Sequence, residues 1–194
     1  YPPARSIESR HRLIFTVRRL SPKLREKAKR IKLLLLDVDG VLTDGRIIMD
    51  DTGKELKHFD VRDSHGIRLI IRSGIQVGIM TGRFSKVVRH RAKDLGIRMV
   101  FQKVHRKMEV YEKIKKKSRL SDREIVYMGD DIVDLPVLRK AGLAVTVRGA
   151  WEGLMKHVDY VTRHKGGEGA VRELVEIVLQ AQEKWEVITK SYYK

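Results

Sequence analysis

The chain has 194 residues, of which 42% are hydrophobic, and this is enough for one globular domain with a sizeable core. It contains no cysteine, which excludes disulfides, thiolate metal sites and a cysteine nucleophile. Its 42 Lys and Arg residues outnumber 25 Asp and Glu residues, for a formal net charge of +17. No apolar run reaches the ~18 residues of a membrane-spanning helix, so we expect a soluble cytoplasmic protein without a membrane partner.

The positive charge is spread over most of the chain, with local densities at residues 18–32 and 113–119. Such charge is compatible with a nucleic-acid surface, a membrane-surface patch or the attraction of anionic substrates. No zinc-finger spacing, aromatic RNA-binding signature or recognition-helix motif accompanies it. We therefore favour a solvated face over a nucleic-acid partner.

The first 30 residues form a basic, weakly patterned segment, which we interpret as an arm, or a helix over 22–30, outside the core. Residues 31–194 are expected to form one domain that ends in a C-terminal helical tail. Strand-like runs lie at 31–38, 75–80, 97–102, 124–130, 143–147 and 159–162, and helical patterns at 63–73, 84–94, 106–117, 131–141, 151–157 and 168–190. This alternation predicts an α/β fold, a parallel sheet with helices on both faces.

The segment GRIIMDDTGKELKHFD, residues 45–60, interrupts the alternation. Two short strand-like runs flank DDTG, which predicts a β-hairpin inserted after the first strand. Ligands of open α/β sheets bind beyond the carboxyl ends of the strands. The hairpin would therefore project over the binding region like a flap.

Four predicted strands end in polar side chains suited to handling phosphate. Asp37 and Asp39 close the first, Thr81 and Arg83 follow the second, Lys103 and Lys107 the third, and Asp130, Asp131 and Asp134 the fourth. Asp130 and Asp134 would share one helix face, where they could hold a cation together with Asp37. Without a cation, repulsion between close carboxylates would force a proton onto one of them.

Each of these residues also has a purely structural explanation. A strand-end aspartate often caps a helix or forms a turn, and the glycines of TGR and MGDD can be simple strand-to-helix turns. A lysine on a lysine-rich helix is usually solvated. The convergence of four successive strand ends on one rim favours a phosphate-handling site over these separate explanations.

The ordered motifs DVDGVLTDG, IMTGR, Lys107 and GDDIVDLP resemble the four motifs of the haloacid dehalogenase superfamily of phosphohydrolases. The segments ELKHFDVRDSHGIRLI and YVTRHKGGEGAVREL, together with the hairpin, are similar to its small capless branch, typified by 3-deoxy-D-manno-octulosonate 8-phosphate phosphatase. The resemblance covers about residues 32–184. It implies a three-layer Rossmann-like fold with a flap hairpin and no large cap domain.

This resemblance implies distinct catalytic roles for four side chains. Asp37 would be the nucleophile that forms an aspartyl-phosphate, and Asp39 would protonate the leaving oxygen and then activate water. Thr81 and Lys107 would bind the transferring phosphoryl group. Lys107 is preferred to Lys103 because the lysine of the family begins the helix after the third strand.

The resemblance also implies Mg²⁺ as the cofactor. Its ligands would be the carboxylates of Asp37 and Asp130 and the backbone carbonyl of Asp39, a set of hard oxygens that suits this ion. Asp131 and Asp134 would not bind the ion themselves but would hold its ligands or its waters in place.

The implied substrate is a sugar-acid phosphate, with 3-deoxy-D-manno-octulosonate 8-phosphate of lipopolysaccharide biosynthesis as the first candidate. Arg62, Asp63, Gly82 and Arg83 are its expected contacts. Glu168 in GGEG stands where octulosonate enzymes often carry a basic residue, which leaves a nonulosonate 9-phosphate as the alternative. The branch further implies a homotetramer in which the flap and the C-terminal tail of a neighbouring subunit close each site.

Two other classes of protein stay open at this stage. A noncatalytic interaction domain on the same fold predicts eroded motifs, whereas the expected aspartates, threonine and lysine are all present. A nucleic-acid-associated protein, or a phosphatase of nucleic-acid ends, predicts binding that falls steeply with salt.

Overall fold

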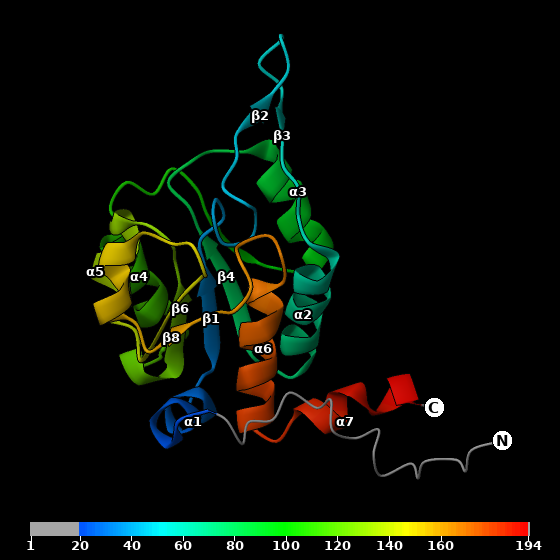
Figure 1. The fold of residues 1–194 in the computed structure, drawn as a ribbon, viewed down its shortest axis with the longest axis vertical. Helices are drawn as coiled ribbons and strands as arrows, with labels where there is room; N and C mark the ends of the chain where they lie inside the picture. Colours follow the sequence, from blue (N-terminus) through cyan, green and yellow to red (C-terminus); the bar gives the residue numbers. More distant parts are fainter. Residues whose placement is uncertain (1–19, 194) are drawn as a thin grey trace, which may run out of the picture.

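The computed structural model describes residues 20–193. Its main sheet has six strands in the order β5-β4-β1-β6-β7-β8, and every neighbouring pair is parallel. These strands are β1 (Leu33–Leu36), β4 (Gln76–Met80), β5 (Met99–Phe101), β6 (Ile125–Met128), β7 (Leu143–Thr146) and β8 (Tyr160–Val161). The predicted parallel sheet is confirmed, with β1 in its interior (Figure 1).

The four leucines of β1 explain why this strand lies inside the sheet. All four are fully buried, and successive side chains of a strand point to opposite faces. Leu34 and Leu36 belong to the hydrophobic cluster on one face, whereas Leu33 and Leu35 belong to the cluster on the other. A continuous apolar run is what a parallel strand covered on both faces requires. Its last residue therefore delivers Asp37 to the edge of the sheet.

Helices cover both faces and complete three layers (Figure 1). One face carries α1 (Pro22–Lys29), α2 (Val61–Arg72), α3 (Lys86–Leu95) and α6 (Ala170–Ala181), and the other carries α4 (Lys107–Ser118) and α5 (Leu135–Leu138). Short 3₁₀ helices are η3 (Asp122–Glu124), η4 (Ile132–Asp134) and η5 (Glu152–His157). The predicted helix over 131–141 is thus split into η4 and α5, and the one over 151–157 is a 3₁₀ helix.

The predicted hairpin is present. β2 (Ile48–Met49) and β3 (Glu55–Leu56) pair antiparallel and form a separate two-stranded sheet. The Asp50 side chain closes the turn by accepting hydrogen bonds from the backbone N–H groups of Thr52 and Lys54 at 3.0 and 2.8 Å. The hairpin projects away from the domain beyond the carboxyl ends of the main strands, at the top of Figure 1.

The structure corrects the expectation that the segment before residue 31 lies outside the core. Leu24 and Ala28 of α1 are buried within the main hydrophobic cluster, and the Lys27 ammonium lies 2.6 Å from the Asp159 carboxylate. These two apolar residues are four positions apart, so they share one face of α1. The basic composition around them conceals this short apolar face. The remainder of the predicted arm lies outside the described residues.

The predicted C-terminal helix over 168–190 is interrupted. α6 ends at Ala181, and a second helix, α7 (Trp185–Thr189), precedes the 3₁₀ helix η6 (Lys190–Tyr193). Glu183 has a positive φ of 58°, and the Lys184 N–H bonds back to the Leu179 carbonyl at 2.8 Å. This is a left-handed helix end built without glycine, which apolar periodicity does not reveal.

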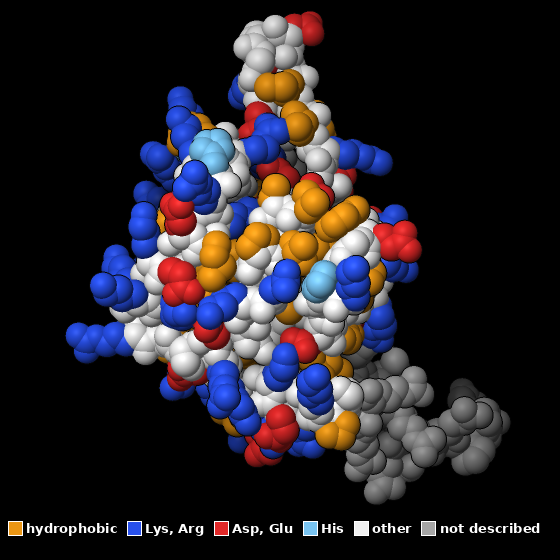
Figure 2. Space-filling model, turned by 90° about the vertical axis from the view of Figure 1, so that its left-hand side faces the viewer, with side chains coloured by type: hydrophobic (Ala, Val, Ile, Leu, Met, Phe, Trp, Pro, Cys, Tyr) orange, Lys and Arg blue, Asp and Glu red, His pale blue; other side chains and the backbone are white. Residues whose placement is uncertain are grey.

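Lys and Arg side chains are scattered across the view in Figure 2, and hydrophobic side chains gather on the hairpin and on the face below it. Within residues 20–193, no helix is both long and apolar enough to cross a membrane.

Candidate active site

A cavity of about 470 Å³ opens at the carboxyl ends of β1, β4 and β6. Most of the predicted site residues line it, namely Asp37, Asp39, Thr81, Gly82, Arg83, Lys107, Asp130 and Asp131. Gly45, Val104, His105 and Val133 complete its wall. Parallel strands bring these distant segments together because their carboxyl ends meet at one edge of the sheet. The predicted convergence of strand ends is therefore real.

Lys107 lies at the centre of the charged groups in this cavity. Its ammonium is 2.8 Å from the Asp37 carboxylate and 2.5 Å from that of Asp134, and the side chain is only 3% exposed. It is the first residue of α4, as predicted. Lys103 extends elsewhere, with its ammonium 5.2 Å from the centre of the Phe84 ring. The structure thus brings Lys107, and not Lys103, to the strand-end aspartates.

Asp134 is fully buried, and hydrogen bonds occupy both of its oxygens. One oxygen accepts from the Lys107 ammonium and the Tyr127 hydroxyl. The other accepts from the backbone N–H groups of Asp130 and Asp131 at 3.0 and 3.1 Å. Asp134 therefore fixes the loop that carries Asp130, which matches its predicted supporting position. Tyr127, a buried residue of β6, had no signal in the sequence beyond its place in an apolar run.

Burial dominates the protonation of the site. It raises the pKa of Asp37 to about 6, even though the nearby Lys107 ammonium opposes this. Burial, together with the charges of Asp37 and Asp134, raises the pKa of Asp130 to about 7. For Lys107, burial would lower the pKa, but the two carboxylates outweigh it and the pKa rises. The carboxylates of the cluster thus hold more negative charge than one ammonium compensates.

The donor set fits a hard divalent cation. One carboxylate oxygen from each of Asp37, Asp130 and Asp134 lies within 4.8 Å of the other two. Each Asp134 oxygen already accepts two hydrogen bonds, whereas each Asp37 oxygen faces a single donor, so Asp37 and Asp130 are the carboxylates with room for an ion. Within residues 20–193, no hydrogen-bond donor reaches the Asp130 carboxylate. Carboxylate and carbonyl oxygens are the ligands that Mg²⁺ prefers.

Gly40 makes this arrangement sterically possible. It has a φ of +88°, and a side chain in its place would collide with the Asp130 carboxylate. The turn that follows Asp39 can therefore pass directly beside the second acidic strand end. Asp44 has a structural turn role, since its carboxylate accepts a hydrogen bond from the Arg46 N–H at 3.1 Å.

Asp39 interacts with Lys57, which the sequence-based predictions missed, and with Arg83, which they assigned only to substrate binding. The Lys57 ammonium pairs with the Asp39 carboxylate and lies 3.2 Å from Glu55, and Arg83 lies 3.7 Å from Asp39 and 2.8 Å from Glu55. The Lys57 side chain is almost fully buried. Lys57 directly follows β3 and is two positions after Glu55, so both side chains lie on one side of the hairpin chain.

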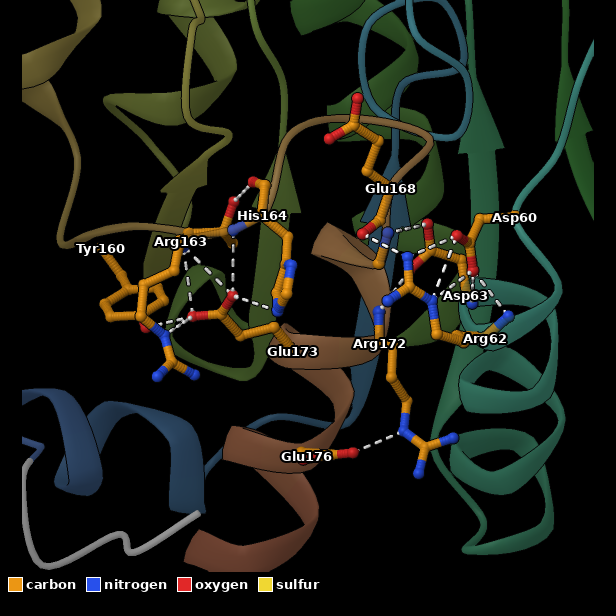
Figure 3. A network of polar contacts seen from close by, with 12 residues as sticks. Asp60, Arg62, Asp63, Tyr160, Arg163, His164, Glu168, Arg172, Glu173 and Glu176 are labelled. Atoms are coloured by element: carbon orange, nitrogen blue, oxygen red, sulfur yellow. Dashed lines mark hydrogen bonds and ion pairs between the residues drawn. The ribbon is translucent and has the colours of Figure 1, made fainter.

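Arg62 and Asp63 do not line the cavity. The Arg62 guanidinium pairs with Asp60 at 2.8 Å and donates to the Glu168 carbonyl at 2.7 Å. The Asp63 carboxylate is buried against the N-terminus of α6 and accepts the backbone N–H groups of Gly169 and Arg172 (Figure 3). Within this chain, neither side chain is positioned as the predicted contact to a ligand in the cavity.

The fold and the cavity define a class of protein, a phosphate-handling α/β enzyme with acidic strand ends, and comparisons with known proteins agree. A model of the haloacid dehalogenase-like hydrolase family matches residues 97–174. A 3-deoxy-D-manno-octulosonate 8-phosphate phosphatase of Salmonella typhimurium is 45% identical over 165 residues, which are 85% of this chain and 88% of the relative.

Solved structures of similar proteins lead to the same class. A phosphatase of the same description from Yersinia pestis is 42% identical with a TM-score of 0.85, and covers 86% of this chain and 90% of its own. One from Moraxella catarrhalis, in complex with magnesium, phosphate and a KDO molecule, is 39% identical with a TM-score of 0.86, covering 88% and 98%. This chain belongs to the haloacid dehalogenase-like hydrolases, in the family that contains the 3-deoxy-D-manno-octulosonate 8-phosphate phosphatases.

Proposed function

We propose that this protein is a Mg²⁺-dependent phosphatase that hydrolyses 3-deoxy-D-manno-octulosonate 8-phosphate. The observation that carries the proposal is the cluster of Asp37, Asp130 and Asp134 at the end of the central strand, where the Lys107 ammonium pairs with Asp37 and Asp134. Relatives of that description match at 45% identity over most of both chains. The site retains the motif residues that a noncatalytic domain would be expected to lose.

The first step of the proposed reaction forms an aspartyl-phosphate. A carboxylate oxygen of Asp37 attacks phosphorus as the bond to the sugar oxygen breaks. The Val38 N–H donates to the other oxygen of this carboxylate at 2.7 Å, which fixes its orientation. Lys107 and Thr81 would donate to the phosphoryl oxygens where negative charge accumulates.

Asp39 is the proposed proton carrier. It would give its proton to the departing sugar oxygen, and then take a proton from the water that cleaves the aspartyl-phosphate. Lys57 and Arg83 hold the carboxylate at the mouth of the cavity. When bound, Mg²⁺ would neutralise phosphoryl charge, held by the carboxylates of Asp37 and Asp130 and the backbone carbonyl of Asp39.

A doubly anionic sugar-acid phosphate suits the rim of this cavity. Arg83 is partly exposed there, and a guanidinium can grip a carboxylate through two hydrogen bonds. His105 and Gly82 line the same opening. The net charge of +17 would also draw anionic substrates toward the protein.

We further propose a cytoplasmic homotetramer in which neighbouring subunits cover the site. The hairpin exposes four apolar side chains that the chain itself does not bury, Ile47, Ile48, Met49 and Leu56. Val133 on the cavity wall and its neighbour Ile132 are also exposed, and hydrophobic side chains are visible on the hairpin and on the face below it in Figure 2. Exposed apolar surface of this kind favours association. Light scattering during size-exclusion chromatography would measure the mass, and a Met49→Lys variant should shift it downward.

The first test is phosphate release from a panel of sugar phosphates with Mg²⁺. We expect hydrolysis of 3-deoxy-D-manno-octulosonate 8-phosphate, and a loss of at least ~10³-fold in Asp37→Asn, whose amide is a poor nucleophile. Asp94→Asn on α3, which removes an exposed carboxylate, should retain activity. If no member of the panel released phosphate, the proposed phosphatase activity would be refuted. A clear preference for a nonulosonate 9-phosphate would replace the proposed substrate with that compound.

A further inference from the structure

The loop of residues 163–169 connects β8 to α6 and reaches the turn that follows Asp39. Its sequence, RHKGGEG, ends at the N-terminus of α6. Two buried acidic side chains from different helices hold the two ends of this loop, Glu173 from α6 and Asp63 from α2 (Figure 3). Neither of them lines the cavity of the active site.

Glu173 holds the first part of the loop. Its carboxylate accepts the backbone N–H groups of Arg163 and His164 at 3.1 and 3.3 Å. The same group accepts the Tyr160 hydroxyl at 2.5 Å and the Arg163 guanidinium at 3.1 Å. Glu173 is 5% exposed, so these bonds take the place of water around the carboxylate. In Figure 3 they converge on one side chain in the first turn of α6.

Asp63 holds the last part of the loop. Its carboxylate accepts the Gly169 N–H at 3.2 Å and the Arg172 N–H at 2.7 Å, and the residue is 1% exposed. Both donors lie at the start of α6, where backbone N–H groups have no partner within the helix. A residue of α2 thus fixes where the loop joins α6.

Between these two anchors, Gly166 and Gly167 press against the turn that begins at Gly40. The Gly167 N–H donates to the Val41 carbonyl at 3.0 Å. A side chain at Gly166 would overlap the Gly40 carbonyl, and one at Gly167 would meet the backbone of Thr43. Loop and turn are therefore in contact, backbone against backbone.

The same turn is bounded on its other side by the active site. Gly40 lies against the Asp130 carboxylate, and Asp39 immediately precedes it. The hairpin that supplies Glu55 and Lys57 to Asp39 and Arg83 follows the turn. A shift of the loop would consequently move the proton carrier and the flap, while Asp37 stays directly after β1, held by the hydrogen bond from its N–H to the Met128 carbonyl.

We propose that the 163–169 loop, anchored by Glu173 and Asp63, positions Asp39 and the flap for proton transfer to the leaving group. Glu173 and Asp63 are positioning residues, since they act through the backbone of the loop and the turn. The inference rests on the proposed function, because it assigns the loop to one half of that reaction. Loosening the loop should impair protonation of the leaving oxygen more than attack on phosphorus.

The dependence on the leaving group separates this role from a general loss of structure. A nitrophenolate departs without help, whereas an alkoxide or phenolate of high pKa needs a proton in the transition state. The ratio kcat/KM covers the steps up to departure of the leaving group. A merely structural defect lowers kcat/KM for all phosphates by a common factor. A misplaced proton carrier lowers it more for the poorer leaving groups.

The experiment compares kcat/KM for p-nitrophenyl phosphate, phenyl phosphate and 3-deoxy-D-manno-octulosonate 8-phosphate. In Glu173→Gln and Gly167→Ala we expect a loss of about tenfold or more for the last two and less than about threefold for p-nitrophenyl phosphate. Glu176→Gln removes a carboxylate of α6 that bonds Arg172 and not the loop. Gly74→Ala places a side chain at a similar positive φ in open space. Both controls should keep the wild-type ratios.

Equal losses for all three phosphates, or no loss in either loop variant, would overturn the proposal. If Glu173→Gln does not give folded protein by circular dichroism, the comparison of Gly167→Ala with Gly74→Ala decides in the same way. A wild-type protein that hydrolyses none of the phosphates would instead refute the proposed function. The two failures are therefore distinguishable.

Discussion

Two groups of carboxylates differ in their bonding: Asp63 and Glu173 at the N-terminus of α6, and Asp37, Asp130 and Asp134 at the cavity. At the N-terminus of α6, Asp63 and Glu173 each accept two backbone N–H groups. In the cavity, Asp134 is similarly occupied, whereas the Asp130 carboxylate has no donor within residues 20–193. The first group holds backbone segments together, and the second has carboxylate oxygens that remain available to a cation.

The comparison shows that burial alone does not mark a functional carboxylate. Burial is the largest effect on both Asp63 and Asp130, with the pKa raised to about 6 in the first and about 7 in the second. For Asp63, backbone N–H groups oppose the rise, whereas for Asp130 the charges of Asp37 and Asp134 add to it. Uncompensated repulsion among neighbouring acids is what points to a missing cation.

The largest expected effect on stability comes from Asp134, which belongs to the cavity but is bonded like the structural group. Asp134→Ala should lower the free energy of unfolding by about 3–5 kcal/mol, because it leaves the buried Lys107 ammonium with one partner fewer. Urea denaturation measures this. Asp131→Ala, which removes the side-chain cap of the short helix η4, should cost about 1 kcal/mol. Similar losses in the two variants would contradict the distinction between them.

The next effect is the response to Mg²⁺. At a concentration of 100 times its Kd, the ion should stabilise the wild-type protein by about 2.7 kcal/mol, since it binds the folded chain. Asp130→Asn removes one expected ligand and one negative charge. It should abolish this gain, and in EDTA the variant should be at least as stable as the wild type. Thermal unfolding with and without Mg²⁺ checks both statements, and a full Mg²⁺ response in Asp130→Asn would show that the ion binds elsewhere.

The sequence was sufficient for the sheet and for most of the cavity, because both depend on periodicity. The apolar run of β1 fixes its burial, and strand ends of a parallel sheet must share one edge. Asp37, Thr81 and Asp130 follow from that rule, whereas the choice of Lys107 over Lys103 came from the resemblance to the family. The prediction of one uninterrupted C-terminal helix was wrong, because the interruption depends on a left-handed backbone conformation at Glu183. Glutamate gives no signal of such a conformation in the sequence.

Residues that act across layers were out of reach of the sequence. Lys57 meets Asp39 only because the hairpin folds back over the strand ends. Asp63 was expected to contact the substrate, but the packing of α2 against α6 directs it to Gly169. Such pairs are more than 15 residues apart in the chain, and no local pattern relates them.

The smallest expected effect concerns the pH dependence of the structural group. The pKa of Asp63 is raised to about 6 in the folded protein, against about 3.9 in an unfolded chain. Its neutral form is thus favoured by folding, so its contribution to stability is complete below pH ~4 and is lost as the pH rises through 6. Asp63→Asn should therefore flatten the decline of unfolding free energy between pH 5 and 8 by about 1 kcal/mol.

This prediction is measured by urea unfolding in EDTA at a series of pH values. Asp37 and Asp130 titrate in the same range and in the same direction, so the wild-type decline contains their contributions as well. The difference in unfolding free energy between wild type and Asp63→Asn isolates the contribution of Asp63, and Asp51→Asn at the exposed hairpin tip supplies the control. A variant whose decline parallels the wild type would mean that the two backbone N–H groups offset the cost of burial, so that Asp63 stays ionised like an exposed carboxylate.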